Sequence, residues 1–129
     1  ERGIGICIVS SGLSVVLEKL VDKIGIIPDF AQVNLLKLEK GVVRGIEIRV
    51  GYWDKGRMVD GIVSLSGIDP RMVAVVGDSE NDLSMFRSPY LRIAINPSSD
   101  ELRRAADLVF EEWDLRPVCD AILERFNLR

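Results

Sequence analysis

The stretch Val75-Val76-Gly77-Asp78-Ser79-Glu80-Asn81-Asp82 decides the fold of this chain. Residues 72–76 form a short apolar run rich in β-branched side chains, which is typical of a buried strand. The loop that follows gathers three carboxylates, and these would repel one another unless a cation lay among them. Magnesium typically binds one or two carboxylates together with substrate phosphate, and ligands of open α/β sheets bind beyond the carboxyl ends of strands. The pattern indicates a divalent cation site; the alternative is an acidic surface turn that caps a helix beginning near Asp82.

A second strand-to-helix junction lies near the start of the chain. Residues 4–9 are apolar and predict a strand that ends in Ser10-Ser11-Gly12, and an amphipathic helix over 13–24 follows, closed by Gly25. A hydroxyl and free backbone N–H groups at such a turn can bind an anion, because the helix N-terminus carries partial positive charge. Taken singly, Ser10 and Ser11 also fit as ordinary N-cap residues.

A lysine stands at the start of a further helical stretch, in Asp54-Lys55-Gly56. Cations are disfavoured at the positive end of the helix dipole. A bound phosphate or a neighbouring carboxylate would remove this conflict, whereas a lone lysine is usually a solvated charge.

In this order, the three elements resemble motifs two, three and four of the haloacid dehalogenase superfamily, the aspartate-nucleophile phosphatases. Ile8-Val9-Ser10-Ser11-Gly12 resembles the second motif, Lys55 matches the lysine of the third, and residues 77–82 match the acidic fourth motif closely. A hairpin predicted between residues 33 and 50 favours the phosphoserine phosphatase branch. The resemblance covers essentially the whole chain.

The resemblance assigns roles to individual residues. Ser10 would donate a hydrogen bond to a phosphoryl oxygen, helped by the backbone N–H groups of Ser11 and Gly12. Lys55 would neutralise charge on the phosphoryl group, and Asn81 would contact the phosphate or the loop.

The fourth motif would supply the metal site. Asp78 would bind Mg²⁺ directly, and Asp82 would support the site through water. The catalytic residues implied within this chain are thus Ser10, Lys55, Asp78 and Asp82.

The first motif of the family, Asp-x-Asp, does not occur in these 129 residues. In the family its first aspartate is the nucleophile and its second is the general acid/base. We therefore expect residues 1–129 to be the C-terminal portion of a core domain, without the cap and without a second domain. The expected fold is an α/β, Rossmann-like parallel sheet with flanking helices and a β-hairpin. This sheet would be incomplete, because the central first strand is missing and apolar edges are left to pair with another chain.

Three explanations of the missing strand stay open: a fragment of a longer phosphatase, completion by a separate polypeptide, or a self-standing chain whose strands pair directly, as in a homodimer. The first predicts a Mg²⁺-dependent hydrolase of a small phosphorylated metabolite, with phosphoserine as the leading substrate and the nucleophile outside this chain. A non-catalytic binding or assembly module is the alternative. A phosphomutase or sugar-phosphate hydrolase would share the same core motifs.

Composition narrows the function further. The net charge of −3 and the lack of a basic run argue against nucleic acid as a partner. The sequence contains neither an export signal nor an apolar run long enough to cross a membrane. Cys7, expected on a buried strand, and Cys119 do not form a disulfide framework, which favours the cytoplasm. Histidine is absent, which excludes His-activated nucleophiles and the common His zinc sites.

Strands alternating with helices predict a mostly parallel sheet. A capping-box pattern at Ser98 and Glu101 predicts a helix start. The remaining expected elements are strands over 33–38, 43–50, 90–95 and 107–110 and helices over 55–67 and 114–126.

Overall fold

The computed structural model describes residues 3–128, and the chain divides into two compact units, Glu1–Lys55 and Gly56–Arg129. The first unit holds β1 (Cys7–Leu13), α1 (Ser14–Ile24), β2 (Phe30–Glu39) and β3 (Val42–Glu47). Helix α2 (Lys55–Ser66) begins at the boundary. The second unit continues with η1 (Pro70–Met72), β4 (Ala74–Gly77), η2 (Glu80–Met85), β5 (Leu91–Ile95), α3 (Asp100–Ala105), β6 (Leu108–Phe110) and α4 (Arg116–Arg125).

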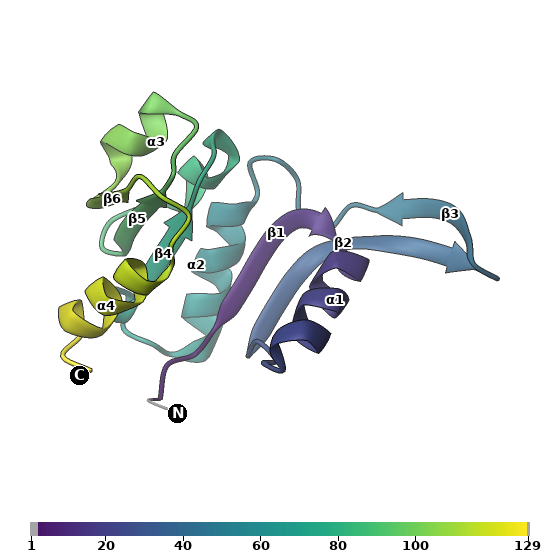
Figure 1. The fold of residues 1–129 in the computed structure, drawn as a ribbon, viewed down its shortest axis with the longest axis horizontal. Coiled ribbons are helices and arrows are strands. Elements are labelled where there is room, and N and C mark those ends of the chain that lie inside the picture. Colours follow the sequence, from purple (N-terminus) through teal and green to yellow (C-terminus); the bar gives the residue numbers. More distant parts are fainter. Residues whose placement is uncertain (1–2, 129) are drawn as a thin grey trace. The chain divides into compact units, whose positions relative to one another are not determined.

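The first unit is a three-stranded mixed sheet in the order β1-β2-β3 (Figure 1). β1 and β2 run parallel because α1 connects them, and β2 and β3 form the predicted antiparallel hairpin. The hairpin turns at Lys40 and Gly41, which both adopt positive φ, 50° and 77°. A two-residue turn with positive φ at both positions matches the twist of the flanking strands, which explains the glycine.

β1 extends further than the sequence predicts. It runs through the Ser10-Ser11-Gly12 segment to Leu13, and α1 begins only at Ser14, with Leu13 as its N-cap residue. Val9 pairs with Gln32, but the next pair is Leu13 with Asn34, so β1 carries two more residues than β2 across this interval. The Ser10–Gly12 segment is therefore a bulge in the strand, and its serines are not helix caps.

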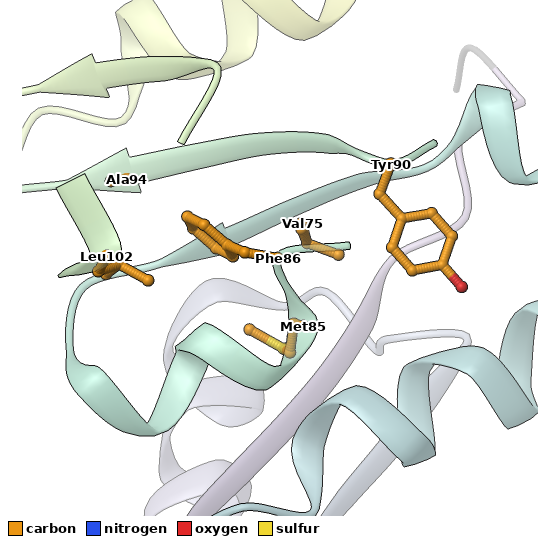
Figure 2. Packing of buried hydrophobic residues seen from close by; sticks show 6 residues of the cluster. All are labelled: Val75, Met85, Phe86, Tyr90, Ala94 and Leu102. Carbon is orange, nitrogen blue, oxygen red and sulfur yellow. The ribbon is translucent and has the colours of Figure 1, made fainter. Parts of the chain in front are cut away.

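The second unit contains a parallel sheet in the order β4-β5-β6. Alternate residues of β5 serve its two faces, because side chains alternate along a strand. Ala94 packs with Val75, Met85, Phe86, Tyr90 and Leu102 (Figure 2). On the other face, Leu91, Ile93 and Ile95 pack with Val118 of α4. Both faces of β5 are thus covered, as expected for a strand inside a parallel sheet.

The sheet expected to be incomplete is present as two three-stranded sheets, and β1 and β4 are edge strands in the part of the chain that the structure describes. The first unit buries little: Cys7 is exposed, so its predicted burial is wrong, and no residue of α1 is buried. The helices of residues 3–128 lack the length and apolar character of a membrane span.

Candidate phosphate and metal site

The loop after β4 is ordered by one carboxylate. Oδ2 of Asp82 accepts hydrogen bonds from the backbone N–H groups of Asp78 at 2.9 Å and Ser79 at 3.2 Å. Asp82 is only 4% exposed. It packs so closely on Gly77 that a Cβ added there would lie 2.5 Å from the Asp82 Cβ. Asp82 therefore shapes the backbone around Asp78.

Asp78, half-buried, is also held through its carbonyl oxygen. This oxygen accepts hydrogen bonds from the backbone N–H of Ser98 at 2.9 Å and from its hydroxyl at 3.2 Å. The predicted helix cap at Ser98 is therefore off by one residue, because Ser99 caps α3 and Ser98 serves the loop after β4. These hydrogen bonds link the loop that follows β4 to the loop that follows its neighbour β5, at the carboxyl ends of the two strands.

Asn81 is the third polar residue of this loop. Its Oδ1 accepts a hydrogen bond from the Ser79 hydroxyl at 2.5 Å. This contact orients the Asn81 amide within the loop.

The donor set of the loop suits Mg²⁺. The ion usually takes one or two carboxylates and completes its ligands with water and phosphate oxygens, and Asp78 provides a carboxylate at the end of β4. Oδ2 of Asp82 accepts hydrogen bonds from two backbone N–H groups, so this oxygen organises the loop. Among residues 3–128, no group of three or more His, Cys, Asp or Glu side chains is arranged around a common point.

In the first unit, the bulge of β1 orients a hydroxyl. The backbone N–H of Gly12 donates to Ser10 Oγ at 3.0 Å. Because a hydroxyl has two lone pairs and one proton, this bond occupies an acceptor position and leaves the Ser10 proton for an anion. In this structure the Gly12 N–H donates its hydrogen bond to Ser10 Oγ. The resemblance implies instead that this N–H donates to a phosphoryl oxygen.

Lys55 is the first residue of α2 and is 7% exposed. The next residue, Gly56, is locked in place: its N–H donates to Ser84 Oγ at 3.0 Å. An added Cβ at Gly56 would lie 1.9 Å from the Ser84 carbonyl oxygen. The first turn of α2 is therefore packed directly against η2, and only glycine fits there.

A polar cluster secures the same helix one turn later. Asp60 of α2 accepts hydrogen bonds from Arg87 and, at 2.8 Å, from the Tyr90 hydroxyl. The pKa of Tyr90 is raised to about 12, mainly by burial of the phenol and to a lesser extent by its hydrogen bond to Asp60. In Figure 2 the Tyr90 hydroxyl points away from the apolar cluster that holds its ring.

The predicted site residues gather in two groups. Ser10, Ser11 and Gly12 share the β1 bulge, while Asp78, Asn81 and Asp82 share the loop after β4. Lys55 starts the helix between the two groups in sequence. Sequence reasoning assigned no role to Asn34, Gly56 or Ser84 and gave Ser98 a different one. Of the first three, Asn34 carries a signal, as an amide within an apolar strand.

The chain is similar to known hydrolases in sequence and in fold. A model of the haloacid dehalogenase-like hydrolases matches residues 27–122. A phosphoserine phosphatase of Methanocaldococcus jannaschii is 33% identical over 120 residues, covering 92% of this chain and 56% of that protein. A phosphoglycolate phosphatase of Archaeoglobus fulgidus is 37% identical over 68 residues, which cover 53% of this chain and 30% of that protein.

A solved structure described as a phospho-aspartyl intermediate analogue of phosphoserine phosphatase superimposes with a TM-score of 0.79 at 30% identity. The match covers 93% of this chain and 57% of that structure. The chain thus spans little more than half the length of the phosphoserine phosphatases it matches. Because the family model covers most of the chain, including α2 and the loop after β4, the chain belongs to the haloacid dehalogenase-like hydrolases.

Proposed function

We propose that this chain is the C-terminal part of the core of a Mg²⁺-dependent phosphomonoesterase that acts on a small metabolite through an aspartyl-phosphate. The carrying observation is the loop after β4, where the buried carboxylate of Asp82 orders the backbone that presents Asp78. Such a preorganised acidic loop at the carboxyl end of a parallel strand is suited to hold a metal ion and a phosphate together.

Phosphoryl transfer mainly requires positioning and electrostatic stabilisation, and residues of this chain would supply both. Ser10, oriented by Gly12, would donate its hydroxyl proton to a phosphoryl oxygen. The Lys55 ammonium would balance the negative charge of the phosphoryl group. Asp78 would hold Mg²⁺, which phosphatases of this family typically use, and the bound ion would neutralise phosphoryl oxygens.

The covalent steps would fall to residues outside these 129, because the sequence has no Asp-x-Asp segment. The nucleophilic aspartate would attack phosphorus, and the P–O bond to the leaving alcohol would break. A second carboxyl group would protonate the leaving oxygen and so form the alcohol. That carboxylate would then take a proton from the water that attacks the aspartyl-phosphate, which releases inorganic phosphate and restores the aspartate.

For the substrate, phosphoserine is the leading choice. The M. jannaschii phosphoserine phosphatase matches this chain over 92% of its length, including the β2–β3 hairpin region, whereas the phosphoglycolate phosphatase matches only 53% of it. A phosphomutase or sugar-phosphate hydrolase would use the same loops, because the phosphoryl group and not the rest of the substrate contacts them.

We also propose that a further strand completes the sheet, from a segment outside these residues or from another chain. The edges of β1 and β4 could each accept such a strand, and apolar residues near them are exposed, including Ile4, Ile6 and Val76.

Both cysteines are free, which is consistent with a reducing, cytoplasmic setting.

The test is hydrolysis of p-nitrophenyl phosphate and of phosphoserine by the full-length protein that carries this chain. We expect turnover with Mg²⁺, loss of turnover with EDTA, and recovery when Mg²⁺ is added back. An inactive full-length protein with Asp78 intact would contradict the proposal. A stable, discrete oligomer of the 129-residue chain, inactive but able to bind phosphate, would instead favour the non-catalytic module.

A further inference from the structure

Asn34 forms a buried polar junction in the first unit. It lies in β2, is 4% exposed, and interrupts an otherwise apolar run, Val33-Asn34-Leu35-Leu36. A buried amide in such a strand is costly unless its hydrogen bonds are satisfied. At Asn34 both N–H donors and both acceptor positions are occupied, which is the full capacity of an amide.

The partners of this amide belong to two separate segments. Nδ2 donates to the carbonyl oxygen of Ser11, in the β1 bulge, at 2.8 Å. It also donates to the carbonyl oxygen of Val50 at 3.3 Å. Oδ1 accepts from the backbone N–H groups of Arg49 and Val50, both at 2.8 Å. One side chain therefore joins the bulge to the segment that follows β3.

That second segment leads directly to Lys55. Val50 is 1% exposed, and the next N–H, that of Gly51, donates to Oδ2 of Asp54 at 3.0 Å. An added Cβ at Gly51 would lie 2.6 Å from the same oxygen, so the turn is tightly closed. The segment that leads to Lys55 is thus held by side-chain hydrogen bonds, from Asn34 at Val50 and from Asp54 at Gly51.

We propose that Asn34 is a positioning residue for phosphate binding: it holds the Ser10–Gly12 bulge and the Arg49–Lys55 segment in one arrangement. The inference rests on the proposed function, because it takes Ser10 and Lys55 as the phosphate-contacting groups. Irregular strand segments re-aim side chains beside active sites, and such a segment needs a support that a regular ladder does not provide. Asn34 acts on substrate only through these two segments.

Substitutions at Asn34 separate positioning from packing. Asn34→Asp keeps the shape and the acceptors for Arg49 and Val50, but it replaces the donor to Ser11 with an oxygen that repels the carbonyl. Asn34→Ala removes all four hydrogen bonds, and Asn34→Ser leaves a hydroxyl with room for a water molecule. In the full-length protein, each variant is measured for kcat and KM on phosphoserine, for Kd of inorganic phosphate, and for thermal unfolding.

Asp29 offers a matched control at the other end of the same strand pair. Its Oδ2 accepts a hydrogen bond from the backbone N–H of Ile6 at 2.8 Å, which joins the starts of β1 and β2. Asp29→Ala therefore removes a side-chain link between these strands without touching the bulge or the Arg49–Lys55 segment.

We expect kcat to fall about 30-fold or more in Asn34→Asp and Asn34→Ala, since displacements near 1 Å are enough for such losses. Phosphate binding should weaken at least about fivefold in the same folded variants, and Asp29→Ala should stay within about twofold of wild type in both quantities. Wild-type kcat in a folded Asn34→Ala protein would overturn the inference, as would an equal loss in Asp29→Ala. Failure of all three Asn34 variants to fold would overturn it too, because the amide would then serve the fold as a whole. An inactive wild-type protein would defeat the proposed function itself, and this inference with it.

Discussion

The N–H of Gly56 donates to Ser84 Oγ at 3.0 Å, and the position of a Gly56 Cβ lies 1.9 Å from the carbonyl oxygen of Ser84. This contact joins the first turn of α2 to η2, the short helix of the acidic loop. Any side chain at residue 56 would push these two backbones apart.

Gly56→Ala should therefore destabilise the protein. Overpacking of a close contact costs roughly 1–3 kcal/mol, and here the clashing atom belongs to the backbone. Gly61→Ala is the matched control, because it lies in the same helix with open space around its Cβ position. There alanine should stabilise by about 0.5–1 kcal/mol. Urea unfolding of both variants checks the prediction; equal effects would contradict the close contact.

Tyr90 predicts a loss of stability in alkali. Its pKa is raised to about 12 by burial and by the hydrogen bond to Asp60, so the folded state favours the neutral phenol relative to the unfolded chain. The resulting stabilisation is complete below the unfolded value of about 10. It is lost as the pH rises through the folded value. Urea unfolding at pH 9 and at higher pH should show wild type losing on the order of 2 kcal/mol more than Tyr90→Phe. Parallel pH profiles of the two proteins would contradict this assignment, and Tyr52→Phe serves as the control.

Asp78→Asn should remove activity while leaving the fold intact. The substitution keeps the backbone groups that Asp82 and Ser98 hold, but it removes the charge needed for Mg²⁺. We expect kcat of the full-length protein to fall about 100-fold or more, with a change in unfolding free energy below about 1 kcal/mol. Comparable losses of activity and stability would identify Asp78 as a structural residue of the loop.

Asp82→Ala should reduce both activity and stability. It leaves the N–H groups of Asp78 and Ser79 without their acceptor in a largely buried loop, and each such loss costs about 1–3 kcal/mol. Asp82→Asn retains an oxygen that can accept both hydrogen bonds, so it should recover most of the stability. Thermal unfolding and kcat of the two variants separate these effects; equal unfolding temperatures would contradict the organising role of Asp82.

Several elements could be predicted from local sequence because local chemistry specifies them. Gly25 ends α1 with positive φ, and its N–H bonds to the Val21 carbonyl oxygen, as a helix C-cap glycine should. The β2–β3 hairpin, α2 and the parallel pairing of β4 with β5 follow the predicted pattern. The acidic loop also occurs where the abrupt end of an apolar strand predicts it.

Other features depend on partners distant in the chain. The bulge at Ser10–Gly12 needs Asn34, 23 residues beyond Ser11, to hold its carbonyl oxygen. Ser98 does not cap the helix as predicted, because its hydroxyl donates to the carbonyl oxygen of Asp78, which is 20 residues earlier in the sequence. Rules based on periodicity or helix capping cannot predict these contacts, because each contact depends on how the β-strands pair.

The sequence by itself therefore determined the kinds of elements, their order and the polar residues at the strand ends, because hydrophobic periodicity and turn chemistry act over a few residues. The sequence also indicated the protein family, through the motif of the acidic loop. Only the tertiary structure decided how these residues are supported. Asp82 accepts hydrogen bonds from its own loop, Gly56 packs against Ser84, and Asn34 links two segments. The physical reason is that buried polar groups must find hydrogen-bond partners wherever the fold provides them.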